Sequence, residues 1–195
     1  MINIKMTPIT RKQEIINTAA LLFKEKGFNA VSMRDLAQEM GIKAASIYNH
    51  LPSKQSILGA IIFEVSVEFT NHINSVFDES RPILQKLEAI ITMHIDLTLE
   101  KSEFLACMNN DWVHLNDVDK KQYIKMRNAY EEKFRTLLRQ GIREKALKPI
   151  DQEIMLFSIL STLRTFYLWY AKHKMLDFEK VKRDLCTTLL MGIRS

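Results

Sequence analysis

Residues 32–54 read SMRDLAQEMGIKAASIYNHLPSK, and this stretch decides how the first part of the chain folds. Ser32 and Asp35 have the spacing of a capping box, which marks the start of a short helix that ends at Gly41. A second short helix fits residues 44–50. Because glycine permits a tight reversal between the two helices, the spacing predicts a helix–turn–helix.

The second of these helices has the surface expected of a DNA-reading helix. In a helix–turn–helix it enters the major groove, and flanking donors bind phosphate oxygens. The side facing the groove would be small and polar, formed by Ala44, Ala45, Ser46 and Asn49. The side chains able to donate to phosphates are Tyr48, His50 and Lys54. Three alternatives stay open: Tyr48 is a half-buried packing residue whose hydroxyl bonds a backbone group, Lys54 is an ordinary solvated lysine, or the two-helix unit docks a protein instead of DNA.

Positive charge is concentrated around this unit. The net charge is +5, from 28 Lys and Arg against 23 Asp and Glu. Residues 1–54 hold 8 basic and 4 acidic side chains, a balance of +4, whereas residues 55–195 have a balance of +1. An excess in the first quarter of the chain favours a polyanionic partner there. Charge and spacing together predict that this partner is double-stranded DNA.

Composition and periodicity predict an all-α protein of about nine helices. Of the 195 residues 47% are apolar, which excludes disorder, and 5 Gly and 4 Pro are too few for the turns of a β-sandwich or barrel. Apolar residues recur at helical spacing along the chain. Two cysteines cannot form a disulfide framework, no unbroken apolar run reaches the ~18 residues of a membrane span, and no signal peptide is evident. We therefore expect a cytoplasmic protein without a membrane partner.

The ordered run from Leu36-Ala37 through Gly41 to Tyr48 and Lys54 resembles the DNA-binding domain of TetR-family transcriptional regulators, over about residues 10–58. The resemblance implies that Tyr48 and Lys54 contact phosphates, and that the small polar side defined above faces the groove.

The resemblance also indicates further DNA contacts, and the sequence departs from the family pattern at two positions. Ser32, Met33, Arg34 and Lys43 complete the predicted DNA-binding set. Lys43 stands where the family usually has a capping Ser or Thr, and Leu51 stands where it usually has Phe. Since Lys43 cannot cap the helix, we expect it to contact the DNA backbone or a guanine edge.

The resemblance divides the chain into a DNA-binding domain at residues 1–52 and a helical ligand-binding and dimerisation domain at residues 53–195. The candidate residues for an effector cavity in the second domain are Phe104, Met108, Trp112, Tyr123, Arg127, Tyr130, Phe134, Arg164 and Tyr167. For each aromatic side chain the alternative is ordinary core packing. Arg127 and Arg164 lie among apolar residues, where each either pairs with Asp or Glu or binds an anionic group of the effector.

A looser resemblance concerns the effector. Trp112, the run from Arg127 to Tyr130, and Gly141 are similar to a subset of the family that regulates fatty-acid and sterol degradation and responds to acyl-coenzyme A thioesters. A Gly usual in that subset near Lys145 is missing here. The implied effector is a small apolar or acyl-CoA-like molecule.

The last two predicted helices carry more apolar residues than one buried face of each requires. These residues are Ile154, Phe157, Leu160, Leu168, Val181, Leu185, Leu189 and Ile193. Two such helices from each protomer can form an isologous four-helix interface. The resulting homodimer would set its reading helices about 34–36 Å apart, or a small multiple of this, and would bind a palindromic operator.

The sequence contains no motif typical of catalysis or of metal binding. The five histidines form no close helical pair, and HExxH, CxxC, GxSxG and phosphate-binding glycine loops are absent. We expect no catalytic residue, metal or cofactor. Together with the helix–turn–helix, the resemblance implies a ligand-responsive DNA-binding regulator, a repressor released from its operator by the effector. The rival hypothesis is a helical protein-interaction module that does not bind DNA.

Overall fold

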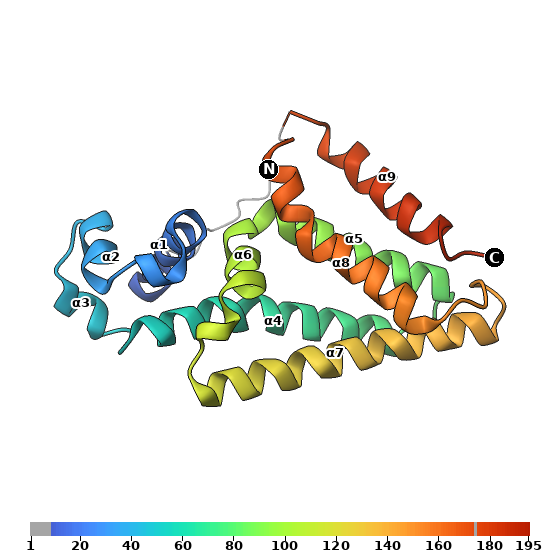
Figure 1. The fold of residues 1–195 in the computed structure, drawn as a ribbon, viewed down its shortest axis with the longest axis horizontal. Coiled ribbons are helices and arrows are strands. Elements are labelled where there is room, and N and C mark those ends of the chain that lie inside the picture. The colour runs from blue at the N-terminus through green and yellow to red at the C-terminus, as the bar shows by residue number, and fades with distance from the viewer. Residues whose placement is uncertain (1–8, 174) are drawn as a thin grey trace, which may run out of the picture.

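The computed structural model describes residues 9–173 and 175–195, and these residues form nine α-helices and two short 3-10 helices. In chain order the elements are α1 (Arg11–Lys26), η1 (Phe28–Ala30), α2 (Met33–Glu39), α3 (Ala44–Tyr48), α4 (Lys54–Asp78), α5 (Ile83–Glu100), α6 (Ser102–Asn110), η2 (Trp112–His114), α7 (Asp117–Arg143), α8 (Gln152–Ala171) and α9 (Phe178–Met191). For the described residues, the prediction of an all-α protein with about nine helices is confirmed. Residues 1–8 of the predicted N-terminal domain lie outside the described residues. Helices α1–α3 gather at one end of α4, α7 runs beside α4, and α9 lies beside α5 on the side away from α4 (Figure 1).

The helix–turn–helix forms where the capping residues predict it. Ser32 N donates to Asp35 Oδ2 at 2.8 Å and Asp35 N donates to Ser32 Oγ at 3.2 Å, so the capping box is complete. Gly41 adopts a φ of 63°, the left-handed conformation that the turn into α3 requires. The one difference is that α3 ends at Tyr48, because residues 49–50 already form a turn.

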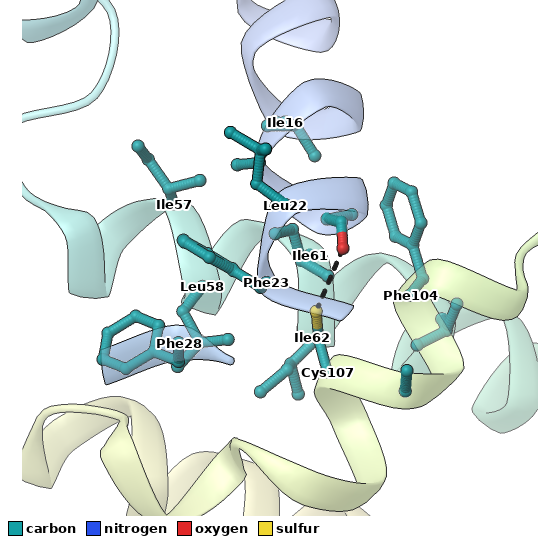
Figure 2. Packing of buried hydrophobic residues seen from close by; sticks show 14 of the residues in the cluster. Ile16, Leu22, Phe23, Phe28, Ile57, Leu58, Ile61, Ile62, Phe104 and Cys107 are labelled. Atoms are coloured by element: carbon teal, nitrogen blue, oxygen red, sulfur yellow. Dashed lines mark hydrogen bonds between the residues drawn. The ribbon is translucent and has the colours of Figure 1, made fainter. Parts of the chain in front are cut away.

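The first hydrophobic core lies where α1, α4 and α6 meet (Figure 2). Phe23 of α1 and Ile57 of α4 are both buried in it. On the α6 side the buried Cys107 thiol donates to the Ala20 carbonyl at 3.8 Å. Because this core continues from α1 into the first half of α4, no break in packing coincides with the boundary predicted at residue 52. The division of the chain by function stays a prediction.

The second hydrophobic core joins the far half of α4 to α5, α7, α8 and α9. Gly141 of α7 has no room for a side chain, since an added Cβ would lie 2.6 Å from Cδ1 of Leu147. Lys145, in the connection to α8, has a φ of 59°. This is the region where the expected Gly is missing, and a lysine held in the left-handed conformation costs about 1 kcal/mol relative to glycine. The connection therefore stores a small strain at Lys145.

Helix α8 has two apolar faces. One face packs against α5, α6 and α7, and the other exposes Ile154 and Phe157. By length and composition alone, α8 is apolar enough to cross a membrane. Its apolar residues do not form one unbroken run, because Glu153 and Arg164 interrupt the helix. Since three helices cover one of its faces, α8 is a core helix of this fold with one apolar face left uncovered.

Candidate DNA-binding and effector sites

Helix α3 presents a polar outer side on a fixed base. Ile47 is fully buried and anchors α3 in the first core, and Ile42 N donates to Ala37 O at 2.9 Å across the turn. The exposed residues on the outer side are Ala45, Ser46, Tyr48, Asn49 and His50. Ala44 is only half-buried, and Tyr48 is 50% exposed. The predicted groove and phosphate contacts of these residues are sterically open, and they stay predictions.

The remaining predicted DNA contacts around α2 divide into free and occupied side chains. Arg34 and Lys43 are exposed, and Lys43 makes no side-chain cap. The Ser32 hydroxyl donates to Asp35 Oδ2 at 2.7 Å, and the hydrogen bonds from Ser32 hold the pKa of Asp35 below its usual range. Met33 is half-buried and packs on the first core. Ser32 and Met33 therefore shape the start of α2, which leaves Arg34 and Lys43 as the free candidates for DNA contact.

Lys54 has a role that the sequence did not predict. Its ammonium donates to the carbonyl oxygens of Phe28 and Val31, each at 2.7 Å, and lies 4.3 Å from the centroid of the Phe28 ring. Burial lowers the pKa of this ammonium, with Asp35 acting in the opposite sense. These hydrogen bonds contradict the alternative of an ordinary solvated lysine. The phosphate contact of Lys54 stays a prediction, and it would have to compete with them. Lys54 ties the start of α4 to the segment between α1 and α2.

A cavity of about 60 Å³ lies inside the bundle, lined by α4, α5, α6, α7 and α8. Five of the predicted effector residues line it: Met108, Tyr123, Arg127, Tyr130 and Arg164. Met126 also lines it, and the lining residues that sequence reasoning missed are Ser66, Phe69, Thr70, His94, Leu105, Asn109, Leu160 and Leu163. Several of these are polar groups inside otherwise apolar helices, and such interruptions are the signal that could have identified them.

The other four predicted cavity residues lie elsewhere. Phe104 packs in the first core, near α1 (Figure 2), and Phe134 is fully buried in the second core. Tyr167 is buried, and its hydroxyl accepts a hydrogen bond from an asparagine of α6. Trp112 packs against Tyr123 outside the lining, with ring centroids 5.8 Å apart and the rings tilted by 40°. None of these four side chains lines the cavity, because helical spacing does not tell which apolar face of a helix turns toward it, and their contact with an effector stays a prediction.

One end of the cavity is formed by a neutral polar pair. His94 Nε2 and Tyr130 Oη lie 2.8 Å apart, and Phe69 stacks on the His94 ring with centroids 4.2 Å apart. Burial lowers the pKa of His94 to about 3, and burial raises the pKa of Tyr130. Both groups are uncharged at neutral pH. This end of the cavity therefore suits an uncharged part of a ligand.

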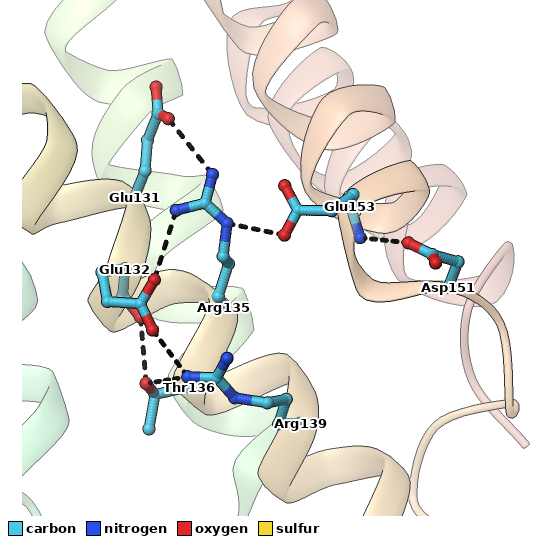
Figure 3. Close-up of polar contacts among 7 residues, drawn as sticks. All are labelled: Glu131, Glu132, Arg135, Thr136, Arg139, Asp151 and Glu153. Carbon is cyan, nitrogen blue, oxygen red and sulfur yellow. Dashed lines mark hydrogen bonds and ion pairs between the residues drawn. The ribbon is translucent and has the colours of Figure 1, made fainter.

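Of the two arginines in the lining, Arg164 is neutralised within the protein. Its Nη2 donates to Glu131 Oε1 at 2.6 Å. Glu131 also lies 3.6 Å from Arg135, and Arg135 donates to Glu153 of α8 at 2.7 Å (Figure 3). This network connects α7 to α8 and holds Arg164 against a carboxylate. For Arg164 the ion-pair alternative is the one that forms.

Arg127 differs from Arg164, since it makes no ion pair with any of the described residues. Its guanidinium lies over two rings instead, 5.2 Å from the centroid of Trp112 and 6.0 Å from that of Tyr123. Cation–π contacts of this kind leave the N–H donors of the guanidinium edge available. Arg127 is therefore the lining residue best suited to an anionic ligand group.

The predicted dimer residues divide into exposed and buried sets. Ile154, Phe157 and Leu168 are exposed on α8, with Phe157 at 69%, and Val181, Leu185 and Leu189 are half-buried on α9. A groove between α8 and α9 is lined by Phe166, Trp169, Val181 and Leu185, together with threonines and Asp184. Leu160 is buried and lines the cavity, and Ile193 is buried in the second core, so neither side chain is exposed on the surface of the protomer. The dimer interface itself stays a prediction.

The structure offers no metal-binding cluster within residues 9–173 and 175–195, where no group of three or more His, Cys, Asp and Glu side chains converges. Burial raises the pKa of the Cys107 thiol to about 12 and also raises that of Cys186. Neither thiol is an activated nucleophile.

Known proteins of similar sequence and structure share this fold. The 188-residue match to the repressor KstR2 of Mycolicibacterium smegmatis is 22% identical and covers 95% of this chain and 92% of that protein. The structure of KstR2 of Mycobacterium tuberculosis, a ketosteroid transcriptional regulator, superposes with a TM-score of 0.89 at 20% identity and covers 95% of this chain and 96% of that one. AibR, solved in complex with isovaleryl coenzyme A and operator DNA, has a TM-score of 0.82 at 21% identity and covers 93% and 98% of the two chains. At these identities the likeness of the structures shows a shared fold.

The family follows from matches to family models. The model of the tetR family of bacterial regulatory proteins matches residues 15–61, which contain the helix–turn–helix. The model of the tetracyclin repressor-like C-terminal domain matches residues 80–193, more than half of the chain. This stretch contains α5 to α9, which supply most of the cavity lining and the uncovered face of α8. The chain belongs to the TetR family of bacterial transcriptional regulators.

Proposed function

We propose that the protein is a homodimeric, cytoplasmic repressor that binds palindromic operator DNA through α3 and leaves it when an effector enters the cavity. Family membership supports DNA binding and regulation, and the exposed polar side of α3 supports its placement in the major groove. The rival hypothesis of a protein-docking module is not favoured, since both parts of the chain match regulators of transcription.

The effector is an apolar molecule that carries an anionic group. Arg127 is the observation that supports this class, because a cation without a carboxylate partner among the described residues borders a largely apolar cavity. An acyl-coenzyme A thioester has both features, an acyl chain for the cavity and phosphates for the guanidinium. The likeness to AibR, whose structure contains isovaleryl coenzyme A, supports the same class.

The size of the cavity supports a switch. Its volume of about 60 Å³ is well below the ~300–1,000 Å³ of typical ligand pockets, so an entering ligand must separate the surrounding helices. Helix α4 lines the cavity through Phe69 and Thr70, and its N-terminus adjoins α3. A tilt of α4 changes the separation of the two reading helices in the dimer, which weakens their fit to one operator.

The uncovered face of α8 and the groove beside α9 support the dimer. Phe157 and Leu168 expose apolar surface that a soluble protein rarely leaves uncovered. Two copies of α8 and α9, related by a two-fold axis, would cover these faces in a four-helix arrangement.

The test compares Arg127→Ala with Arg139→Ala, which removes an exposed arginine from the same helix. Calorimetry with octanoyl-CoA and isovaleryl-CoA measures effector affinity, and fluorescence anisotropy measures release of the operator. A lost charge-assisted contact of about 1.5–3 kcal/mol corresponds to about 10- to 100-fold weaker binding in Arg127→Ala. Arg139→Ala should bind as the wild type does. Equal affinity in both variants would contradict the assignment of Arg127, and absence of binding to the wild type would contradict the effector class.

A further inference from the structure

The two short 3-10 helices, far apart in the sequence, meet at the junction between the helix–turn–helix and the rest of the molecule. The ring of His114 in η2 stacks on the ring of Phe28 in η1, with centroids 5.2 Å apart and planes 15° apart. Asn29 Nδ2 lies 3.4 Å from His114 Nε2. This contact joins the two parts of the chain without passing along α4.

On the DNA-binding side, Phe28 is attached to everything that orients α2. Its ring packs edge-on against Phe23 of α1, with centroids 5.1 Å apart. Its carbonyl accepts from Lys54 at 2.7 Å, and the same ammonium holds the carbonyl of Val31, which immediately precedes the cap of α2. A displacement of Phe28 would therefore also displace the end of α1, the start of α2 and the start of α4.

On the cavity side, η2 is attached to the residue proposed to bind the anion. Trp112, two residues before His114, carries the Arg127 guanidinium 5.2 Å from its ring centroid and lies 5.8 Å from the Tyr123 ring. Arg127 and Tyr123 both line the cavity. Trp112 and His114 belong to the same short helix, so side-chain contacts and the backbone of η2 together connect the cavity to Phe28.

We propose that Trp112 and His114 are positioning residues that couple the cavity to the helix–turn–helix through Phe28. An effector anion that draws Arg127 from the Trp112 ring shifts η2 against η1 and reorients α2 and α3. The inference rests on the proposed function insofar as Arg127 binds the effector. Coupling between two sites is reciprocal, so operator binding must also change the surroundings of Trp112 when no effector is present.

The reciprocal effect provides a test that needs no effector. The chain has 2 Trp, at 112 and 169, so Trp169→Phe leaves Trp112 as the single indole reporter. This protein is titrated with a palindromic duplex selected by the wild type from a random library. We expect the emission and the acrylamide quenching of Trp112 to change at saturation with the duplex, and His114→Ala, added to the same background, to remove most of the change. His114→Phe keeps the stacked ring and should restore it.

A second readout separates coupling from stability. The operator Kd is measured with and without saturating octanoyl-CoA, and Val113→Ala serves as the matched control, because Val113 is an exposed neighbour in the same turn. The ratio of the two Kd values should fall by about 2- to 12-fold in His114→Ala, the factor that one aromatic pair contributes, while Val113→Ala keeps the wild-type ratio.

The outcomes of the two readouts are distinct. Unchanged Trp112 emission on operator binding would overturn the inference, as would equal Kd ratios in His114→Ala and Val113→Ala. If octanoyl-CoA fails to bind the wild type, the proposed effector class fails, and the Trp112 titration still decides the inference.

Discussion

Lys54→Met should destabilise the protein and leave the salt dependence of its operator binding unchanged. The ammonium donates two hydrogen bonds of 2.7 Å, to the carbonyls of Phe28 and Val31, and methionine keeps the aliphatic stem but supplies no donor. A hydrogen bond from a charged group contributes about 1.5–3 kcal/mol, and partial exposure places this pair at the lower end. We expect a loss of about 2–4 kcal/mol in the free energy of unfolding, or roughly 5–15 °C in Tm for a chain of this length.

The assay combines urea unfolding with the salt dependence of operator binding. Each phosphate contact contributes about 0.9 to the slope of log K against log salt, so a dimer that lost one contact per protomer would lose about 2. Because the Lys54 ammonium is engaged by two carbonyl oxygens, Lys54→Met should keep the wild-type slope even where its affinity falls. Lys43→Met is the matched control, since Lys43 is exposed and makes no side-chain cap. It should lower the slope by about 2 and leave stability unchanged.

The result that would refute the reasoning is the reverse pattern. If Lys54→Met unfolds at the wild-type urea concentration and lowers the salt slope by about 2, then Lys54 is a phosphate contact and the hydrogen bonds to Phe28 and Val31 do not stabilise the fold.

Three further predictions concern pH, strain and assembly. The pKa of His94 is about 3 in the folded protein against 6.5 unfolded, so its contribution to stability is complete above pH 6.5 and is lost as the pH falls toward 3. Between pH 7 and pH 5 the free energy of unfolding of the wild type should therefore fall by about 2 kcal/mol more than that of His94→Phe. Equal losses in urea titrations would contradict the burial of a neutral imidazole. Lys145→Gly should raise the free energy of unfolding by about 1 kcal/mol, because it relieves a φ of 59°, and a loss of stability would show that no strain is stored there. Phe157→Glu should turn the dimer into a monomer in sedimentation at micromolar concentration, since an unpaired carboxylate buried in the interface costs roughly 3 kcal/mol or more. Val118→Glu, at a position 75% exposed on α7, should remain dimeric.

Features that depend on local chemistry could be predicted from the sequence. The capping box at Ser32 and the glycine at residue 41 define α2 and the turn to α3, and the structure has both. Cap and turn positions depend on residues within a few positions of each other, so spacing alone identifies them. The outer side of α3 was identified for the same reason.

Features that depend on tertiary packing could not be predicted in this way. The partners of Lys54 are carbonyls in η1 and before α2, more than twenty positions away, and no local sequence pattern predicts them. Phe134 and Leu160 lie on helices with apolar residues on more than one face, and periodicity cannot tell which face meets the cavity, the core or a partner chain. His94 could have been found, because a histidine within an apolar face of a long helix departs from the pattern around it.

The most direct test of the account measures the linkage between effector and operator. Calorimetry determines the affinity of the dimer for a panel of fatty acyl-CoAs, from isovaleryl- to palmitoyl-CoA, with and without saturating operator duplex. The account predicts that at least one thioester binds about 5- to 150-fold more weakly in the presence of operator, and that it weakens operator binding by the same factor. An acyl-CoA that binds in the cavity with the same affinity in the presence and absence of operator would contradict the switch for that ligand.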